Sequence, residues 1–172
     1  DVKVATMSYG YGFSTTALQL AQAYTVLGNS DGKLRPVSLL PISEEPPALE
    51  AIPPRVTTQV RRMMEGVTEL GGTATRAAVT GYRVAGKTGT AHKVGESGYS
   101  DDRYRSLFAG IAPASRPRLA VVVVIDEPQG QDYYGGLVAA PVFSNVMAGA
   151  LRFLDIPPDD LPALRGRIAA LP

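Results

Sequence analysis

The segment RVAGKTGTAHKV, residues 83–94, has the composition of a β-strand, yet Gly86 and Gly89 remove two side chains from it. Between these glycines lie Lys87 and Thr88, one charged and one hydroxyl side chain. Glycine weakens a strand, and it is typical of a bulge or of a position that another backbone or a ligand approaches closely. Two interpretations are open: the glycines relieve a bulge or tight packing under a helix, or they expose a strand edge to a substrate.

The second interpretation gives the segment a chemistry. The backbone N–H near Thr90 would face a ligand oxygen, the hydroxyl of Thr88 would donate a hydrogen bond, and Lys87 would supply positive charge to a carboxylate. Side chains alternate along a strand, so Lys87 and Thr88 are expected on opposite faces. Both reach one pocket if the strand lies at a sheet edge and its twist or a bulge turns Thr88 toward the ligand.

Three strands are predicted in succession, over residues 78–94, 104–112 and 118–126. The turn at 113–117 is short enough to make the second and third an antiparallel hairpin. The run LAVVVVI at 119–125 lacks polar alternation, which indicates a strand covered on both faces. Helices are therefore expected on each side of the sheet.

Apolar spacing and stop signals predict three helices, over residues 14–29, 56–72 and 141–154. Thr16 and Gln19 fit a capping box in the first, and Pro141 is expected near the first turn of the third. In the second helix, one face should pack in the core. Its apolar positions are Val60, Met63, Met64, Val67 and Leu70. A short strand is predicted at 34–40, before an exposed proline-rich excursion at 41–54.

Composition limits the classes of function. With 172 residues and 45% hydrophobic content, the chain can bury one core. Seventeen basic and sixteen acidic residues give a formal charge of +1 without a long basic run, so nucleic acid is not an expected partner. Because there is no cysteine and His92 is the single histidine, chemistry without metal or cofactor is expected. The longest apolar run is far shorter than the roughly 20 residues of a membrane helix.

These elements predict an α+β fold, an antiparallel sheet sandwiched between helices. We expect one compact unit over residues 1–154 and a tail over 155–172, which carries four prolines and should fray. The opening residues from Asp1 show neither a helix start nor an initiator methionine, so the chain is expected to begin inside a domain.

The residues KTGT at 87–90 resemble the third motif of the penicillin-recognising enzymes. Four flanking segments look like the same region of class B penicillin-binding proteins, and most like that of the cell-division transpeptidases of Gram-negative bacteria. These segments are YGYGFSTTALQLAQAY (9–24), GGTATRAA (71–78), YRSLFAGIAP (104–113) and GGLVAAPVFSNVMAGALR (135–152). The resemblance covers residues 8–162, and it implies the C-terminal half of a fold shared by penicillin-binding transpeptidases and serine β-lactamases.

The resemblance implies a serine D,D-transpeptidase that cross-links peptidoglycan stem peptides through an acyl-enzyme and is acylated by β-lactams. Lys87 would belong to the network around the nucleophile, and Thr88 would bind the terminal carboxylate, with Gly89 beside it in the substrate site. The N–H of Thr90 would form half of an oxyanion hole, worth ~3 kcal/mol. The resemblance further implies divisome membrane proteins as partners. It also implies a place on the periplasmic face of the inner membrane, with an N-terminal anchor outside this chain.

Aromatic residues near the motif match the family's site as well. Tyr104, Tyr133 and Tyr134 resemble an aromatic wall that would stack against apolar drug substituents, although Tyr134 also fits ordinary packing. His92 suits a general base, but a polar residue at the mouth of the strand is the preferred interpretation. Thr73 is expected to line the same cleft.

The nucleophile is missing from this chain. The one Ser-x-x-Lys match, Ser30 to Lys33, is a turn sequence with glycine inside it and not a helical turn, so it is rejected. The sequence contains no Ser-x-Asn motif, since Ser144 and Asn145, the nearest match, have no residue between them. The chain alone is therefore expected to be unable to acylate. Three acidic pairs are expected to be solvated loop residues, at 101–102, 126–127 and 159–160.

Two alternatives to a transpeptidase stay open. A D,D-carboxypeptidase or a serine β-lactamase shares the strand motif, and the flanking segments favour the transpeptidase over both. A β-lactam sensor or divisome docking domain would keep the pocket without turnover.

Overall fold

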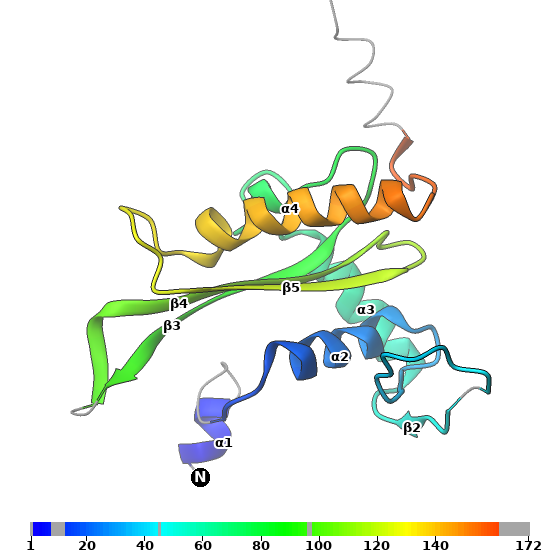
Figure 1. The fold of residues 1–172 in the computed structure, drawn as a ribbon, viewed down its shortest axis with the longest axis horizontal. Coiled ribbons are helices and arrows are strands. Elements are labelled where there is room, and N and C mark those ends of the chain that lie inside the picture. The colour runs from blue at the N-terminus through cyan, green and yellow to red at the C-terminus, as the bar shows by residue number, and fades with distance from the viewer. Residues whose placement is uncertain (1, 8–12, 45, 96–97, 162–172) are drawn as a thin grey trace, which may run out of the picture.

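The computed structural model describes residues 2–7, 13–44, 46–95 and 98–161. A three-stranded antiparallel sheet lies between helix α4 on one face and helices α2 and α3 on the other (Figure 1). The elements in chain order are α1 (Val2–Met7), α2 (Ala17–Gly28), β1 (Lys33–Leu34), β2 (Leu49–Glu50), α3 (Pro54–Glu65), the 3₁₀ helix η1 (Thr75–Ala77), β3 (Ala85–Gly95), β4 (Gly98–Ala112), β5 (Leu119–Asp126) and α4 (Gly135–Phe153). The α+β prediction is confirmed.

The sheet order β3-β4-β5 places the motif strand at an edge. Within the described residues β3 pairs with β4 alone, through Lys87 opposite Ala109 and Thr90 opposite Ser106. Strand β4 begins at Gly98, six residues before the predicted start, and pairs with β5 from Arg105 onward. The β3–β4 hairpin therefore continues beyond the end of β5.

The core between α4 and the sheet is fully closed. Phe143, Met147 and Leu151 of α4 have no exposed surface, and the ring of Phe143 meets that of Phe108 edge to face, with centroids 4.7 Å apart. By length and composition alone α4 could span a membrane. Its buried face against the sheet identifies it as a core helix.

Helix α4 begins at Gly135, so the prediction of a start near Pro141 is wrong. Proline inside a helix leaves the carbonyl four residues earlier without its N–H partner. Here that carbonyl belongs to Leu137, and it accepts a hydrogen bond of 3.3 Å from Nη1 of Arg76 on η1. A residue distant in sequence thus satisfies the group that Pro141 leaves unpaired.

On the opposite face, α2 and α3 cover a second small cluster. Ala85, Ile111 and Ala114 are buried, and Tyr24, Leu27 and Met64 pack against them. Strand β5 contacts both α2 and α4, which confirms the prediction of helices on both sides. The predicted capping box is present, since Thr16 accepts from the Gln19 amide and the Gln19 side chain accepts from the Thr16 amide.

Two predictions on this side are wrong. Helix α3 ends at Glu65 with Gly66 as its C-cap, so Leu70 lies outside the helix, and both Leu70 and Met63 are exposed and not part of the core. The strand predicted at 34–40 is reduced to two paired residues, Lys33 and Leu34. Pro36 explains this end, because proline has no N–H to continue a ladder.

The tail packs on the domain over residues 155–161, so the predicted fraying is wrong there. Ile156 is buried, and its carbonyl accepts a hydrogen bond of 2.6 Å from the hydroxyl of Tyr82. The carboxylate of Asp159 accepts from the backbone N–H groups of Arg83 and Ser115, which makes it an anchor and not a solvated loop acid. Residues 162–172 lie outside the described residues, and the boundary at 154 stays a prediction.

Because Tyr24 is partly buried, the free energy of unfolding should fall with rising pH in the alkaline range. Burial raises the pKa of its phenol to about 12. In the unfolded chain the phenol of Tyr24 ionises near pH 10. The stability that the partly buried, neutral phenol contributes is therefore complete below pH 10 and is lost as the pH rises toward 12. Between pH 9 and 11 we expect wild type to lose about 1 kcal/mol of unfolding free energy relative to Tyr24→Phe. Urea unfolding of both proteins at each pH measures this loss, and parallel pH curves would show that the phenol ionises freely in the fold.

Candidate active site

The edge strand β3 directs its two motif threonines toward the N-terminus of α4. Oγ1 of Thr90 accepts a 3.0 Å hydrogen bond from the backbone N–H of Gly135, the first residue of α4. The hydroxyl of Thr88 donates to Oγ1 of Thr73 at 3.4 Å. Ser106, the partner of Thr90 on β4, is fully buried and donates to the backbone carbonyl of Tyr133. These contacts fix the strand against the segments before η1 and α4.

Lys87 lies on the opposite side of β3, next to α3. Its side chain is exposed, and its Nζ donates to the backbone carbonyl of Thr88 at 3.0 Å. It borders an open pocket of about 430 Å³ between β3, α3 and the turn that follows α3. The other pocket residues are Val60, Met63, Met64, Gly66, Val67, Gly71, Gly72, Thr73 and Gly86.

The position of Thr73 shows how Lys87 and Thr88, whose side chains lie on opposite faces of β3, can belong to one site. It borders the pocket beside Lys87, and it also accepts the hydrogen bond from Thr88. Lys87 and Thr88 therefore leave β3 in opposite directions, as alternation requires, and Thr73 lies next to both sides of the strand. Thr73 borders this pocket, and its place in a substrate cleft stays a prediction.

The two glycines of the motif are explained by packing inside the sheet. A Cβ on Gly86 would lie 2.5 Å from Cζ of Phe108, and a Cβ on Gly89 would lie 2.8 Å from Cγ of Leu107. Tight packing therefore accounts for the missing side chains, but the close atoms belong to the neighbouring strand β4 and not to a helix. The edge is open because β3 has a strand neighbour on one side alone in the described structure. The irregularity in register lies further on, between His92 and Val94.

Four rings form a continuous row beside Thr90. The ring centroids of His92 and Tyr104 are 4.6 Å apart, those of Tyr104 and Tyr133 are 4.0 Å apart, and those of Tyr133 and Tyr134 are 4.5 Å apart. Tyr134 is 55% exposed, which does not fit ordinary core packing. We call these four residues the aromatic row.

His92 has a structural contact that accounts for its orientation. Its Nδ1 lies 2.7 Å from the carbonyl oxygen of Ser100 across the hairpin, so Nδ1 carries a proton and donates it. With its ring tilted by 47° against that of Tyr104, His92 fits the role of a polar residue at the mouth of the strand.

The decoy motifs lie outside this site. Ser30 and Lys33 flank Gly32, which has φ +66°, in a turn and not in a helix. Asp31 in the same turn is bound by the Arg35 guanidinium and by the Lys33 amide, which lower the pKa of its carboxyl to about 2. Ser144 donates to the carbonyl of Ala78 and so serves packing. Among the described residues no group of three or more His, Cys, Asp or Glu side chains could hold a metal ion.

This arrangement matches a known family over most of the chain. The model of the penicillin binding protein transpeptidase domain matches residues 1–148, and the chain belongs to that family.

Similar proteins extend the match. The chain is 48% identical over 170 residues to the probable peptidoglycan D,D-transpeptidase PbpC of Pseudomonas aeruginosa, covering 97% of this chain and 30% of that protein. It is 47% identical over 161 residues to the peptidoglycan D,D-transpeptidase FtsI of Escherichia coli, covering 94% and 27%. The apo structure of the TP domain from Burkholderia pseudomallei penicillin-binding protein 3 matches with a TM-score of 0.83 and 43% identity, covering 92% and 48%. The predicted resemblance in fold is confirmed. The chain spans less than a third of these two curated relatives.

Proposed function

We propose that the complete protein is a serine D,D-transpeptidase that cross-links peptidoglycan stem peptides and is acylated by β-lactams. The observation that carries this proposal is the open edge of β3, which holds Lys87 beside a pocket on one side and Thr88 and Thr90 on the other. Membership of the transpeptidase family and the printed names of the relatives support the same activity.

The reaction would proceed in two acyl transfers. A serine supplied by a part of the protein outside this chain attacks the penultimate D-alanine carbonyl, and the amide C–N bond breaks as the terminal D-alanine leaves with a proton. An amine of a second stem peptide then attacks the ester carbon and releases the serine. The residues of this chain bind and orient the substrate during both steps.

Each motif residue has a distinct role in this scheme. The ammonium of Lys87 stabilises negative charge near the nucleophile, and the hydroxyl of Thr88 donates to the terminal carboxylate. The N–H of Thr90 donates to the developing oxyanion. In an antiparallel ladder the N–H and C=O of one residue point the same way, and alternate residues repeat that direction. The contact of Lys87 Nζ with the Thr88 carbonyl therefore supports an outward N–H at Thr90.

The same proposal assigns the substrate side of the site. Gly89 lies between the two threonines, where a ligand would run along the strand edge. The stacked tyrosine rings lie near Thr90, because Ser106, the partner of Thr90 on β4, donates to the carbonyl of Tyr133. The side chain of the stem peptide or of the drug would therefore contact Tyr104, Tyr133 and Tyr134. We also propose that these 172 residues alone are not acylated by substrate or drug, because the attacking serine is not among them.

The cellular location and the partners are inferred from the same family assignment. We propose that the protein works on the periplasmic face of the inner membrane, held by an anchor outside these 172 residues, with divisome membrane proteins as partners. A D,D-carboxypeptidase or β-lactamase would differ by rapid hydrolysis of the acyl-enzyme. A sensor would bind β-lactam without forming cross-linked product.

The test is labelling of the complete protein with a fluorescent penicillin. We expect one covalent label per molecule that persists for many minutes, and cross-linked product from lipid-linked precursor that disappears after labelling. A folded protein that takes no covalent label would refute the proposal. Rapid loss of the label would favour the hydrolytic alternative, and a stable label without any cross-linking activity would favour the sensor.

A further inference from the structure

The β3–β4 hairpin outruns the third strand of the sheet. Strand β5 ends at Asp126, opposite Arg105, whereas β3 and β4 continue to Gly95 and Gly98. In Figure 1 this part of the hairpin bends away from the three-stranded sheet. A two-stranded ribbon is marginally stable by itself, so we expect contacts at the end of β5 to help hold it in place.

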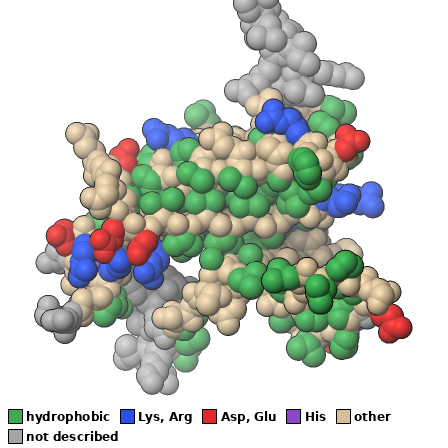
Figure 2. Space-filling model, viewed as in Figure 1, with side chains coloured by type: hydrophobic (Ala, Val, Ile, Leu, Met, Phe, Trp, Pro, Cys, Tyr) green, Lys and Arg blue, Asp and Glu red, His purple; other side chains and the backbone are tan. Residues whose placement is uncertain are grey.

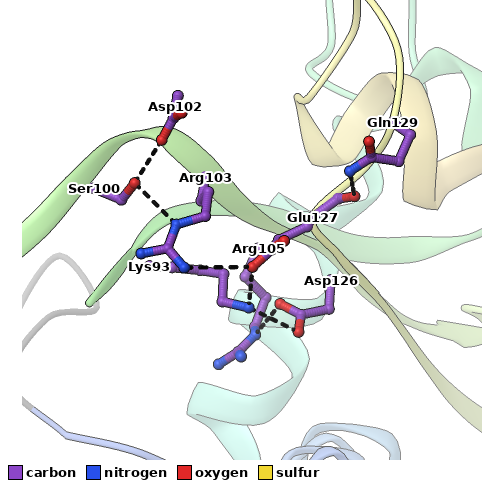
Figure 3. Close-up of polar contacts among 8 residues, drawn as sticks. All are labelled: Lys93, Ser100, Asp102, Arg103, Arg105, Asp126, Glu127 and Gln129. Carbon is purple, nitrogen blue, oxygen red and sulfur yellow. Dashed lines mark hydrogen bonds and ion pairs between the residues drawn. The ribbon is translucent and has the colours of Figure 1, made fainter. Parts of the chain in front are cut away.

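A cluster of charges lies where the hairpin leaves the sheet (Figures 2 and 3). Lys93 follows His92 at the irregularity in register, and its side chain reaches across β4. Its Nζ lies 3.0 Å from Oδ2 of Asp126 and 2.6 Å from Oε1 of Glu127. Asp126 also binds Nε of Arg105 at 3.2 Å. These acids were predicted to be solvated loop residues. Both stay partly exposed, at 53% and 37%, but Asp126 is the last residue of β5, and both carboxylates bind Lys93.

Lys93 is the centre of this cluster. Its side chain is only 20% exposed, although it is a lysine near a hairpin end. Hydrogen bonds to Glu127 and then to Asp126 raise the pKa of Lys93, and the bond from Lys93 is the main reason that the pKa of Asp126 is lowered. An isolated exposed pair contributes little to stability, but an ammonium shared by two carboxylates forms a network.

Glu127 joins the cluster to the aromatic row. It has φ +50°, an unfavourable conformation for a residue with a side chain, and its N–H donates to the carbonyl of Tyr104 at 2.9 Å. The chain then runs from Glu127 to Tyr133 and Tyr134. Successive residues of a strand face opposite sides, so the ring of Tyr104 lies on one face of β4 and the side chain of Arg105 on the other. Arg105 binds Asp126, which also binds Lys93, so the charges lie on the face away from the ring of Tyr104.

We propose that Lys93, Asp126 and Glu127 form a clamp that holds the hairpin and the 127–134 loop at the spacing in which the aromatic row is stacked. Lys93 is thus a positioning residue for the side chain of the substrate or drug. This role rests on the proposed function, because it is the acyl-enzyme site whose specificity the row would set. The clamp acts through Tyr104 and not on the reacting atoms.

The test compares two β-lactams, one with an aryl group in its acyl side chain and one without. In Lys93→Met, which keeps the apolar stem without the charge, we expect the second-order acylation rate of the aryl drug to fall about five- to tenfold. The rate for the other drug should change less than about twofold. Glu127→Gln should act in the same direction, and Lys93→Arg should restore most of the rate. Asp31→Asn, which weakens an ion pair far from the site, is the matched control and should change neither rate.

A merely structural role would not show coupling to the ring. In a Tyr104→Ala background, Lys93→Met should cause no further loss with the aryl drug. Equal losses with both drugs, or losses that add to that of Tyr104→Ala, would overturn the clamp. If the wild-type protein takes up neither drug, the proposed function fails and a crystal structure of Lys93→Met decides the clamp. A parted Tyr104–Tyr133 stack would support it, and unchanged rings would overturn it.

Discussion

Replacement of Lys87 by alanine is expected to slow acylation by a β-lactam by about 10²–10³-fold, the effect of removing one preorganised electrostatic contact from an acyl-transfer site. The melting temperature should change by less than about 2 °C. The reason for this separation is the exposure of Lys87, whose ammonium binds the Thr88 carbonyl at the strand edge and takes no part in the core. Stopped-flow acylation and thermal unfolding of the complete protein measure the two effects.

Lys33→Ala is the matched control for this experiment. Lys33 lies on β1, paired with Glu50 of β2, in a sheet separate from β3. The Lys33→Ala variant should be acylated at the wild-type rate. An unchanged rate in Lys87→Ala would mean that the site is misplaced, whereas equal slowing in both variants would point to a general effect of charge.

Gly135→Ala is expected to lower the free energy of unfolding by about 3 kcal/mol or more, which is large for a single added methyl group. The new Cβ would lie 2.6 Å from the carbonyl oxygen of Gly89 and would also meet that of Leu107. Both atoms belong to backbone in paired strands, so the start of α4 must move instead. Acylation should fall with stability, because the same residue donates to Oγ1 of Thr90.

A second glycine in α4 provides the control. In the described structure, a Cβ on Gly149 would have no atom within 4 Å apart from its chain neighbours and the backbone of its own helix. Alanine there should raise the free energy of unfolding by about 0.5–1 kcal/mol, since alanine favours the helix interior over glycine. Urea unfolding of both variants distinguishes the sites. Similar values for the two would contradict the close docking of α4 on β3 and β4.

The elements that sequence predicted well carry their signals locally. The capping box of α2 is contained in Thr16 to Gln19, and the β4–β5 pairing follows from a five-residue turn between two apolar runs. Both features depend on residues that are close together in the chain. The edge position of the motif strand was one of two interpretations that the sequence left open.

The features that sequence missed depend on distant partners. Helix α4 continues through Pro141 because Arg76 satisfies the freed carbonyl of Leu137. Gly86 is explained by the ring of Phe108 on the next strand. Asp126 is held by Lys93, 33 residues earlier. No local spacing indicates such pairs.

The candidate site shows the same division. Motif spacing selected Lys87, Thr88 and Thr90, but alternation along a strand left it open how two of them could share one pocket. Thr73 resolves this point, because it contacts Thr88 and borders the pocket of Lys87 at once. The position of Thr73 follows from the turn after α3, whose path sequence did not predict.

A crystal structure of the complete protein acylated by a β-lactam tests the central claim most directly. We predict that the drug lies along the outer edge of β3, with its carboxylate within hydrogen-bonding distance of Thr88 Oγ1 and its carbonyl oxygen within hydrogen-bonding distance of the Thr90 N–H. A covalently bound drug that lies away from β3, with neither of these contacts, would contradict the account.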